Sequence, residues 1–189
     1  FAERDFASSP TMVQNDLDYY IKHGEAQVLR QGDKYGYDYY AHVRKANAWA
    51  NGSFNLGGFK ADLALEAGYE TFWREGLVRK GLFAGLDDNG QEFVYNGQVL
   101  TTYDEKTGKA ITSKGNSDIS NFLTYSAKLF LQYQFEGGHR VYATGGYFND
   151  APTFAQSFIS PRTRNSLVPD LTTVKTMSAD LNYQYNNNG

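Results

Sequence analysis

The sequence has 189 residues, a formal net charge of −3 and no cysteine. The lack of cysteine excludes disulfide frameworks, thiolate metal sites and thiol nucleophiles, and the small net charge gives no reason to expect a nucleic-acid partner. Aromatic residues make up 16% of the chain, with 15 Tyr, 19 Gly and only 4 Pro, and the mean hydropathy is negative. No run of about 18 apolar residues occurs, so any membrane crossing would require strands of alternating polarity.

The first predicted strand covers residues 46–56, after a region, 1–36, that we leave as uncertain loop or strand. Small and apolar residues occupy its even positions, and mostly polar residues occupy its odd positions. Gly57 and Gly58 then provide a favourable two-residue hairpin loop, which makes Leu56 and Phe59 face the same way.

The second predicted strand, residues 59–73, shows the clearest alternation. Its odd positions are mostly apolar, and its even positions carry charged side chains: Lys60, Asp62, Glu66 and Glu70. A period of two is that of a strand with one apolar and one polar face, and about fifteen residues is long against the usual five or six.

The same alternation predicts further strands at residues 123–135, 141–147 and 177–185. A three-residue loop of Gly137, Gly138 and His139 would pair Phe135 with Val141 on the apolar face and Glu136 with Arg140 on the polar face. The other two connections, near residues 74–121 and 149–171, are long and polar, although a small hairpin is possible around residues 104–109.

Short and long connections therefore alternate along the chain. In an up-and-down meander this places every tight turn at one end and every long loop at the other, as in outer-membrane barrels. The prolines lie outside the predicted strands, at Pro10, Pro152, Pro161 and Pro169. The predicted fold is all-β, an antiparallel up-and-down meander that forms part of a transmembrane β-barrel. The alternative is a soluble or surface-exposed β-sandwich for binding or adhesion, with the apolar faces packed together.

Several segments carry a family resemblance. They are Ala151-Pro152-Thr153-Phe154, Phe158 to Asn165, Tyr69 to Gly76, Lys80 to Phe83 and Ser178 to Tyr183. With the hairpin of residues 46–69, these segments resemble the barrels of TonB-dependent outer-membrane receptors of Bacteroidetes, and the likeness covers most of the chain from about Tyr37 onward.

The resemblance implies a parent barrel of about 22 strands, with a plug domain inside, that imports a nutrient across the bacterial outer membrane. Its partners would be the lipid bilayer, an unknown nutrient ligand and, through the plug, the TonB complex. The chain starts without an initiator Met or a leader and stops in the turn-like Asn186-Asn187-Asn188-Gly189, so we expect a fragment comprising residues 37–189 of barrel wall and the uncertain region before them. No plug is recognisable in it.

Binding, rather than covalent chemistry, is the expected mechanism, and no catalytic residue, metal site or cofactor is predicted. No Gly-x-Ser-x-Gly or Gly-x-Gly-x-x-Gly motif occurs, the three histidines are scattered, and the acidic stretch at Asp87 reads as a solvated turn. Candidate ligand-binding residues are Lys60, Glu66 and Lys128 on the polar face, for which a merely hydrated barrel interior is the competing explanation. Arg162 and Arg164 are further candidates because guanidinium groups suit carboxylates and phosphates, although packing within the loop would also explain them.

Overall fold

A computed structural model describes residues 16–24, 28–34 and 36–186 of the chain. Its contacts divide the chain into two units. The first contains residues 1–43, 72–120 and 153–171, and the second contains residues 44–71, 121–152 and 172–189. Among the described residues, no helix has both the length and the apolar character needed to cross a membrane.

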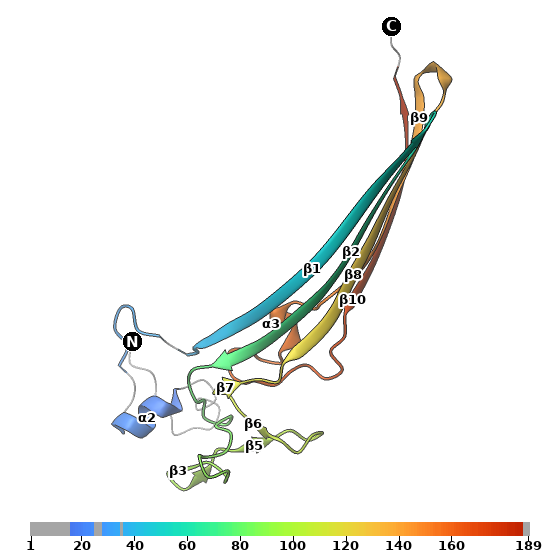
Figure 1. The fold of residues 1–189 in the computed structure, drawn as a ribbon. Helices are drawn as coiled ribbons and strands as arrows, with labels where there is room; N and C mark the ends of the chain where they lie inside the picture. The colour runs from blue at the N-terminus through green and yellow to red at the C-terminus, as the bar shows by residue number, and fades with distance from the viewer. Residues whose placement is uncertain (1–15, 25–27, 35, 187–189) are drawn as a thin grey trace. The chain divides into compact units, whose positions relative to one another are not determined.

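Five long antiparallel strands dominate the second unit (Figure 1). They are β1 (Tyr39–Leu56), β2 (Phe59–Gly76), β8 (Ser120–Gln134), β9 (His139–Asp150) and β10 (Val174–Tyr185). Their order in the sheet, β1-β2-β8-β9-β10, follows the chain, so the long strands form a meander as predicted. Within the described residues the outer edges of β1 and β10 pair with no further strand, and the sheet is open.

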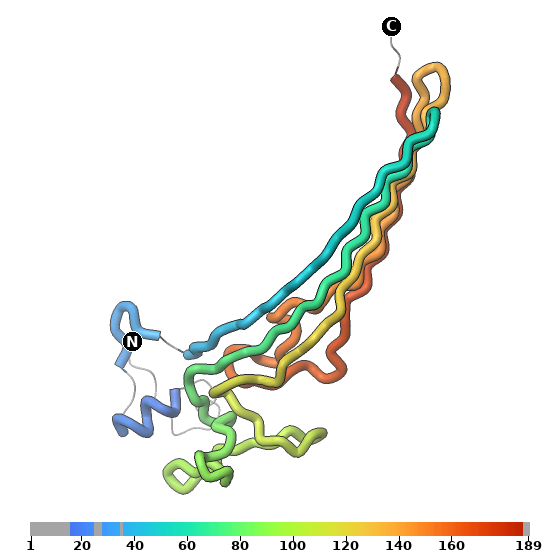
Figure 2. The backbone as a smooth tube through the Cα atoms, viewed as in Figure 1, coloured from blue at the N-terminus to red at the C-terminus, as the bar shows by residue number. Residues whose placement is uncertain are grey.

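The two short turns lie at the same end of this sheet (Figure 2). Gly57, in the turn between β1 and β2, has a φ of 57°, a conformation that glycine adopts without steric cost. Gly58 is needed for a different reason, because a Cβ at this position would collide with the backbone carbonyl oxygen of Gln134 on the neighbouring strand. The predicted two-residue loop is therefore present, and glycine is favoured at its two positions for different reasons.

The turn between β8 and β9 corrects one sequence-based prediction. The loop consists of Glu136–Gly138 rather than residues 137–139, and the amide of Phe135 donates to the carbonyl of His139 at 2.8 Å. Val141 therefore lies opposite Tyr133, and Arg140 lies opposite Gln134. Keeping His139 in the strand lets its ring stack on Tyr185, with the centroids 4.6 Å apart. Because the register shifts by two residues, every side chain keeps its predicted face.

The register separates the two faces of the sheet as the alternation predicted. Leu131 lies opposite Ala143, which lies opposite Leu181, so the three form one cross-strand row on what we call the apolar face. The next row of β8, β9 and β10 lies on the other side, which we call the polar face, and contains Phe130, Thr144 and Asp180. The five leucines at positions 63, 65, 129, 131 and 181 are between 36% and 78% exposed. No second sheet covers them in the described part of the chain.

The first unit contains the long connections, the ends of β1 and β2, and otherwise only short elements. They are α2 (Leu17–His23), β3 (Val94–Tyr95), β4 (Gln98–Val99), β5 (Thr102–Tyr103), β6 (Ala110–Ile111), β7 (Gly115–Asn116) and α3 (Phe154–Ser157). β5 pairs with β6 and forms the small hairpin suggested by the sequence. A compact apolar cluster of Leu17, Ala84 and Leu100 holds this unit together, with Leu82 and Phe93 packed against it.

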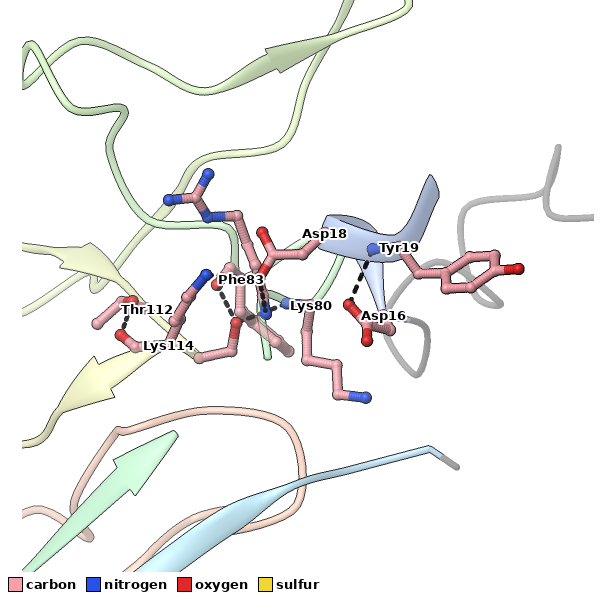
Figure 3. Close-up of polar contacts among 9 residues, drawn as sticks. Asp16, Asp18, Tyr19, Lys80, Phe83, Thr112 and Lys114 are labelled. Carbon is pink, nitrogen blue, oxygen red and sulfur yellow. Dashed lines mark hydrogen bonds and ion pairs between the residues drawn. The ribbon is translucent and has the colours of Figure 1, made fainter. Parts of the chain in front are cut away.

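Helix α2 is attached to the long connection by polar contacts as well as by the burial of Leu17. The Asp16 side chain caps the helix by accepting from the amide of Tyr19 at 3.1 Å. Asp18 forms an ion pair with Lys114 at 2.7 Å (Figure 3). Near this ion pair, the hydroxyl of Ser113 accepts a hydrogen bond of 2.7 Å from the backbone amide of Lys80. Within region 1–36, Leu17–His23 therefore form a helix that belongs to the first unit, which we call the loop unit.

Candidate functional site

A depression of about 480 Å³ lies mainly on the polar face of the sheet, in the second unit. Its wall includes both predicted lysines, Lys60 and Lys128. Asp62, Thr144 and Ser178 add a carboxylate and two hydroxyls, while Phe130 and Phe148 add aromatic rings. β-strand geometry brings these residues together because even-numbered residues of β2, β8, β9 and β10 share one face.

Each lysine of the depression lies over an aromatic ring. The Lys60 ammonium is 5.6 Å from the centre of the Phe130 ring and forms an ion pair with Asp62 at 2.8 Å. The Lys128 ammonium is 5.4 Å from the centre of the Phe148 ring. Such cation–π contacts at exposed sites contribute about 0.5–1 kcal/mol, so they orient the ammonium groups without removing them from solvent.

Gly146 makes room for one of these rings. A Cβ at this position would lie 2.7 Å from the Phe148 ring and 3.0 Å from the Ser178 hydroxyl. The ring can therefore lie over the β9 backbone, beside Lys128, which is the direct cross-strand neighbour of Gly146. No sequence signal had marked Gly146, since an isolated glycine in a strand has several explanations.

Glu66, the third polar-face candidate, lies away from the wall of the depression. Its carboxylate accepts a hydrogen bond of 2.5 Å from the side-chain amide of Asn47 on β1. A similar cross-strand contact joins Lys45 and Glu70 at 3.7 Å. These pairs tie β1 to β2 on the polar face, which gives Glu66 a structural role in addition to any contact with a ligand.

The two candidate arginines belong to the first unit, where each packs on an aromatic ring. The Arg162 guanidinium is 5.2 Å from the ring centre of Tyr37, and that of Arg164 is 5.0 Å from the ring centre of Phe83. The Nε of Arg164 is buried without a hydrogen-bond partner among the described residues. Both arginines therefore take part in packing of the loop, the competing explanation given by the sequence.

A different arginine, Arg74, organises this loop unit and was not singled out from the sequence. Its side chain is 1% exposed, and its Nε donates to the carbonyl of Pro161 at 2.6 Å. One terminal nitrogen donates to the carbonyl of Ser113 at 2.8 Å and to the side-chain oxygen of Asn165. The guanidinium group thus joins the end of β2 to both long connections.

An aromatic cluster completes the attachment of the second long connection. The rings of Phe154 and Phe158 lie 4.7 Å apart, and both contact Phe72 on β2. Tyr39 stacks on Phe154 and also lies under the Arg74 guanidinium, 4.8 Å from its carbon. This cluster was not singled out from the sequence, although an aromatic residue at position 72, on the face where the alternation favours polar or small side chains, is a sequence signal for it.

The histidines do not gather into a metal site. His42 interacts with Glu75 at 2.7 Å and stacks on Trp73, whereas His139 lies 2.6 Å from the Tyr183 hydroxyl. Within the described residues, no group of three His, Cys, Asp or Glu side chains could hold a metal ion. The acidic stretch at Asp87 serves a turn, in which amide donors from Gln91 and Asn89 hold the pKa of the carboxyl below its usual value.

The chain was also compared with known proteins. No family model matches it, and no curated protein or solved structure shows significant similarity to it. The chemistry of the described surfaces is therefore the basis for a functional assignment. The depression offers hydrogen bonds, charge and ring faces, which suit reversible binding of a polar ligand.

Proposed function

We propose that this chain is a wall segment of a TonB-dependent transporter that imports a nutrient ligand across the bacterial outer membrane. The observation that supports a membrane wall is the presence of two uncovered faces of opposite polarity on one sheet of long antiparallel strands, whereas the transporter assignment rests on the resemblance of the sequence. A soluble sandwich would bury its apolar face, whereas a membrane wall presents that face to lipid and the polar face to a wet interior.

The spacing of aromatic residues on the apolar face supports this proposal. On β2, Phe59 and Tyr69 enclose a stretch that contains Leu63 and Leu65. Ten residues at about 3.4 Å each cover about 34 Å along the strand, or about 26 Å across a bilayer at a tilt of about 40°. This height matches the apolar band of about 25 Å that separates the two aromatic girdles of outer-membrane barrels.

The open edges of the sheet also support a wall segment. Within the described part of the chain, no further strand pairs along the outer edge of the 18-residue β1 or of the 12-residue β10, so their backbone groups form no strand ladder there. Long unprotected edges favour pairing with further strands, and in a bilayer such groups require partners. Further barrel strands of the parent protein would supply them.

In this proposal the residues of the polar face line the route of the ligand. Lys60 and Lys128 would contact the ligand from the depression, Glu66 would line the wall, and Arg162 and Arg164 would belong to the extracellular loops. The TonB complex would act through a plug domain of the parent protein.

The membrane part of the proposal is tested by flotation of the full chain with phosphatidylcholine vesicles. We expect flotation, and we expect Leu129→Arg to weaken it strongly, because an arginine near the bilayer midplane costs about 2–4 kcal/mol. The matched variant Ser126→Arg, on the polar face, should float like the original chain. A chain that is soluble without detergent and melts cooperatively would instead support the sandwich alternative.

The transport part is tested in the source cell by deletion of the coding region, followed by mass spectrometry of the growth medium. Deletion should stop the depletion of at least one nutrient, and a protonophore should have the same effect on the undeleted strain. An unchanged depletion profile would contradict the transport function while leaving the membrane assignment intact.

A further inference from the structure

One lysine of the polar-face depression has no acidic partner. The ammonium group of Lys60 is paired with Asp62 at 2.8 Å, so its charge is balanced within the wall. Lys128 forms neither an ion pair nor a hydrogen bond with any described residue, and its side chain is exposed beside the Phe148 ring. The wall therefore has one unbalanced positive charge, and it is located at Lys128.

A single cross-strand row joins this lysine to a hydroxyl group. Lys128 pairs with Gly146, and Gly146 pairs with Ser178. Neighbouring strands are about 4.8 Å apart, which places the backbones of Lys128 and Ser178 about 10 Å from each other. The Ser178 hydroxyl forms no hydrogen bond with another described residue. Because the Phe148 ring lies over Gly146, a ligand that reaches from the ammonium group to this hydroxyl would pass over an aromatic ring.

The next row supplies a second hydroxyl and limits the charge of a ligand. Phe130 pairs with Thr144, and Thr144 pairs with Asp180. The Thr144 hydroxyl donates to the Asp180 carboxylate at 3.3 Å, which leaves its oxygen lone pairs to accept from a ligand hydroxyl. A second carboxylate of a ligand at this row would face Asp180, and like charges at short distance repel each other. The depression therefore favours one negative charge, at the end where Lys128 lies.

We propose that the depression binds a small organic acid that has one carboxylate and several hydroxyl groups. The carboxylate accepts a charge-assisted hydrogen bond from Lys128, the hydroxyl groups pair with Thr144 and Ser178, and the carbon chain between them lies over the Phe148 ring. A volume of about 480 Å³ is in the usual range for small-molecule sites. This inference rests on the proposed function, in which the polar face lines the route of the ligand, and it names the chemical class of that ligand.

The test titrates the full chain, in micelles of an uncharged detergent, with three probes that share a chain of six carbon atoms. Gluconate has the carboxylate and the hydroxyl groups, sorbitol has the hydroxyl groups alone, and hexanoate has the carboxylate alone. NMR follows the backbone amides of Lys128, Gly146 and Ser178. We expect saturable shifts with gluconate, at an affinity about fivefold higher than for either other probe, which corresponds to about 1 kcal/mol.

Two variants separate the charge from the hydroxyl groups. Lys128→Gln should lower the affinity for gluconate to that for sorbitol, whereas Lys45→Gln, the same change on the polar face outside the depression, should leave it unchanged. Ser178→Ala should weaken gluconate and sorbitol about threefold without affecting hexanoate, and Ser126→Ala should affect none of the probes. The comparison of the three probes on the unsubstituted chain decides the matter even if a variant fails to fold.

Several outcomes would overturn this inference. They are equal affinities for gluconate and sorbitol, equal affinities for gluconate and hexanoate, and the absence of saturable shifts at the depression with all three probes. Equal effects of Lys45→Gln and Lys128→Gln would reduce binding to net charge and would also overturn it. Tighter binding of a short capped peptide with one aspartate than of gluconate would assign the depression to a polypeptide and reject the organic acid.

Failure of this inference can be distinguished from failure of the proposed function. Binding of the probes and flotation of the chain with vesicles are measured separately. A chain that floats but does not prefer gluconate would overturn the organic-acid site and leave the membrane wall standing. A chain that does not float would overturn the membrane wall itself.

Discussion

Replacement of Arg74 by methionine should release the loop unit from the end of β2. The substitution keeps a long side chain but removes the donors to the oxygens of Pro161, Ser113 and Asn165, of which the last two accept buried hydrogen bonds. Each buried acceptor left without a partner costs about 1–3 kcal/mol. Removal of a buried charge returns part of its desolvation cost, so we expect a net local destabilisation of about 3 kcal/mol.

Native-state hydrogen exchange of the chain in detergent micelles measures this effect residue by residue. The amides of Ser117 and Asn165, which donate at 2.8 Å to the carbonyls of Arg74 and Thr112, report on the two connections. A loss of about 3 kcal/mol should accelerate their exchange by about 100-fold. The same substitution at the exposed Arg162 should change exchange less than threefold, because its guanidinium group remains hydrated. Exchange at Asn165 that changes less than threefold in the Arg74 variant would refute this account of the loop.

Three further predictions concern single positions. Gly146→Val should displace the Phe148 ring and lower the stability of the sheet by about 1–3 kcal/mol, measured by denaturant unfolding in micelles. Gly58→Ala should destabilise the first turn by at least a similar amount in the same assay, because a backbone carbonyl cannot move aside as a side chain can. Hydrogen-bond donors from Thr107 and Lys106 hold the pKa of the Asp104 carboxyl below its usual value of about 3.8. The stability that this carboxylate contributes to the β5–β6 hairpin is therefore present above about pH 3.8. That contribution should disappear as the pH falls through the lower folded-state pKa, which the amide shift of Thr107 in an NMR titration would report.

Each of these predictions has a control at another position. Gly52→Val should be tolerated better than Gly146→Val, since a Cβ at position 52 meets nothing within 4 Å. Gly57→Asn should be tolerated better than Gly58→Ala, because asparagine adopts positive φ more readily than other side chains. Glu105→Gln should leave the pH dependence of the hairpin unchanged. Equal effects of variant and control would count against the structural reason given in each case.

The sheet could be predicted because its information is local. An apolar residue at every second position of β2 and β8 predicts a strand and also shows whether the odd or the even positions lie on its apolar face. The predicted loop after β8 was wrong by one residue, which shifts the pairing of β8 with β9 by two residues. A Gly-Gly pair fits either loop, and the stacking of His139 on Tyr185 favours the observed one. Tertiary contacts thus corrected a choice that turn composition alone leaves open.

The loop unit could not be predicted in the same way. Arg74 donates to carbonyl oxygens that lie 39 and 87 residues away in the sequence, and any residue type can supply a backbone carbonyl. The cluster around Leu17 and Leu100 likewise joins distant segments that have no shared period. Among the candidate site residues, Lys60 and Lys128 could be placed on the same face because both stand at even positions. Their aromatic neighbours on β8 and β9 could be identified only from the pairing register of the strands.

The strict two-residue repeat also limits how the length of this chain can change in evolution. Insertion of one residue within β8 would move Leu129 and Leu131 to the polar face and bring lysine to the apolar one. Insertions of two residues preserve the faces but change the height of the aliphatic band, while the long connections can change by any number. Homologous chains should therefore differ in strand length mainly by even numbers, apart from bulges, and in loop length without such a restriction.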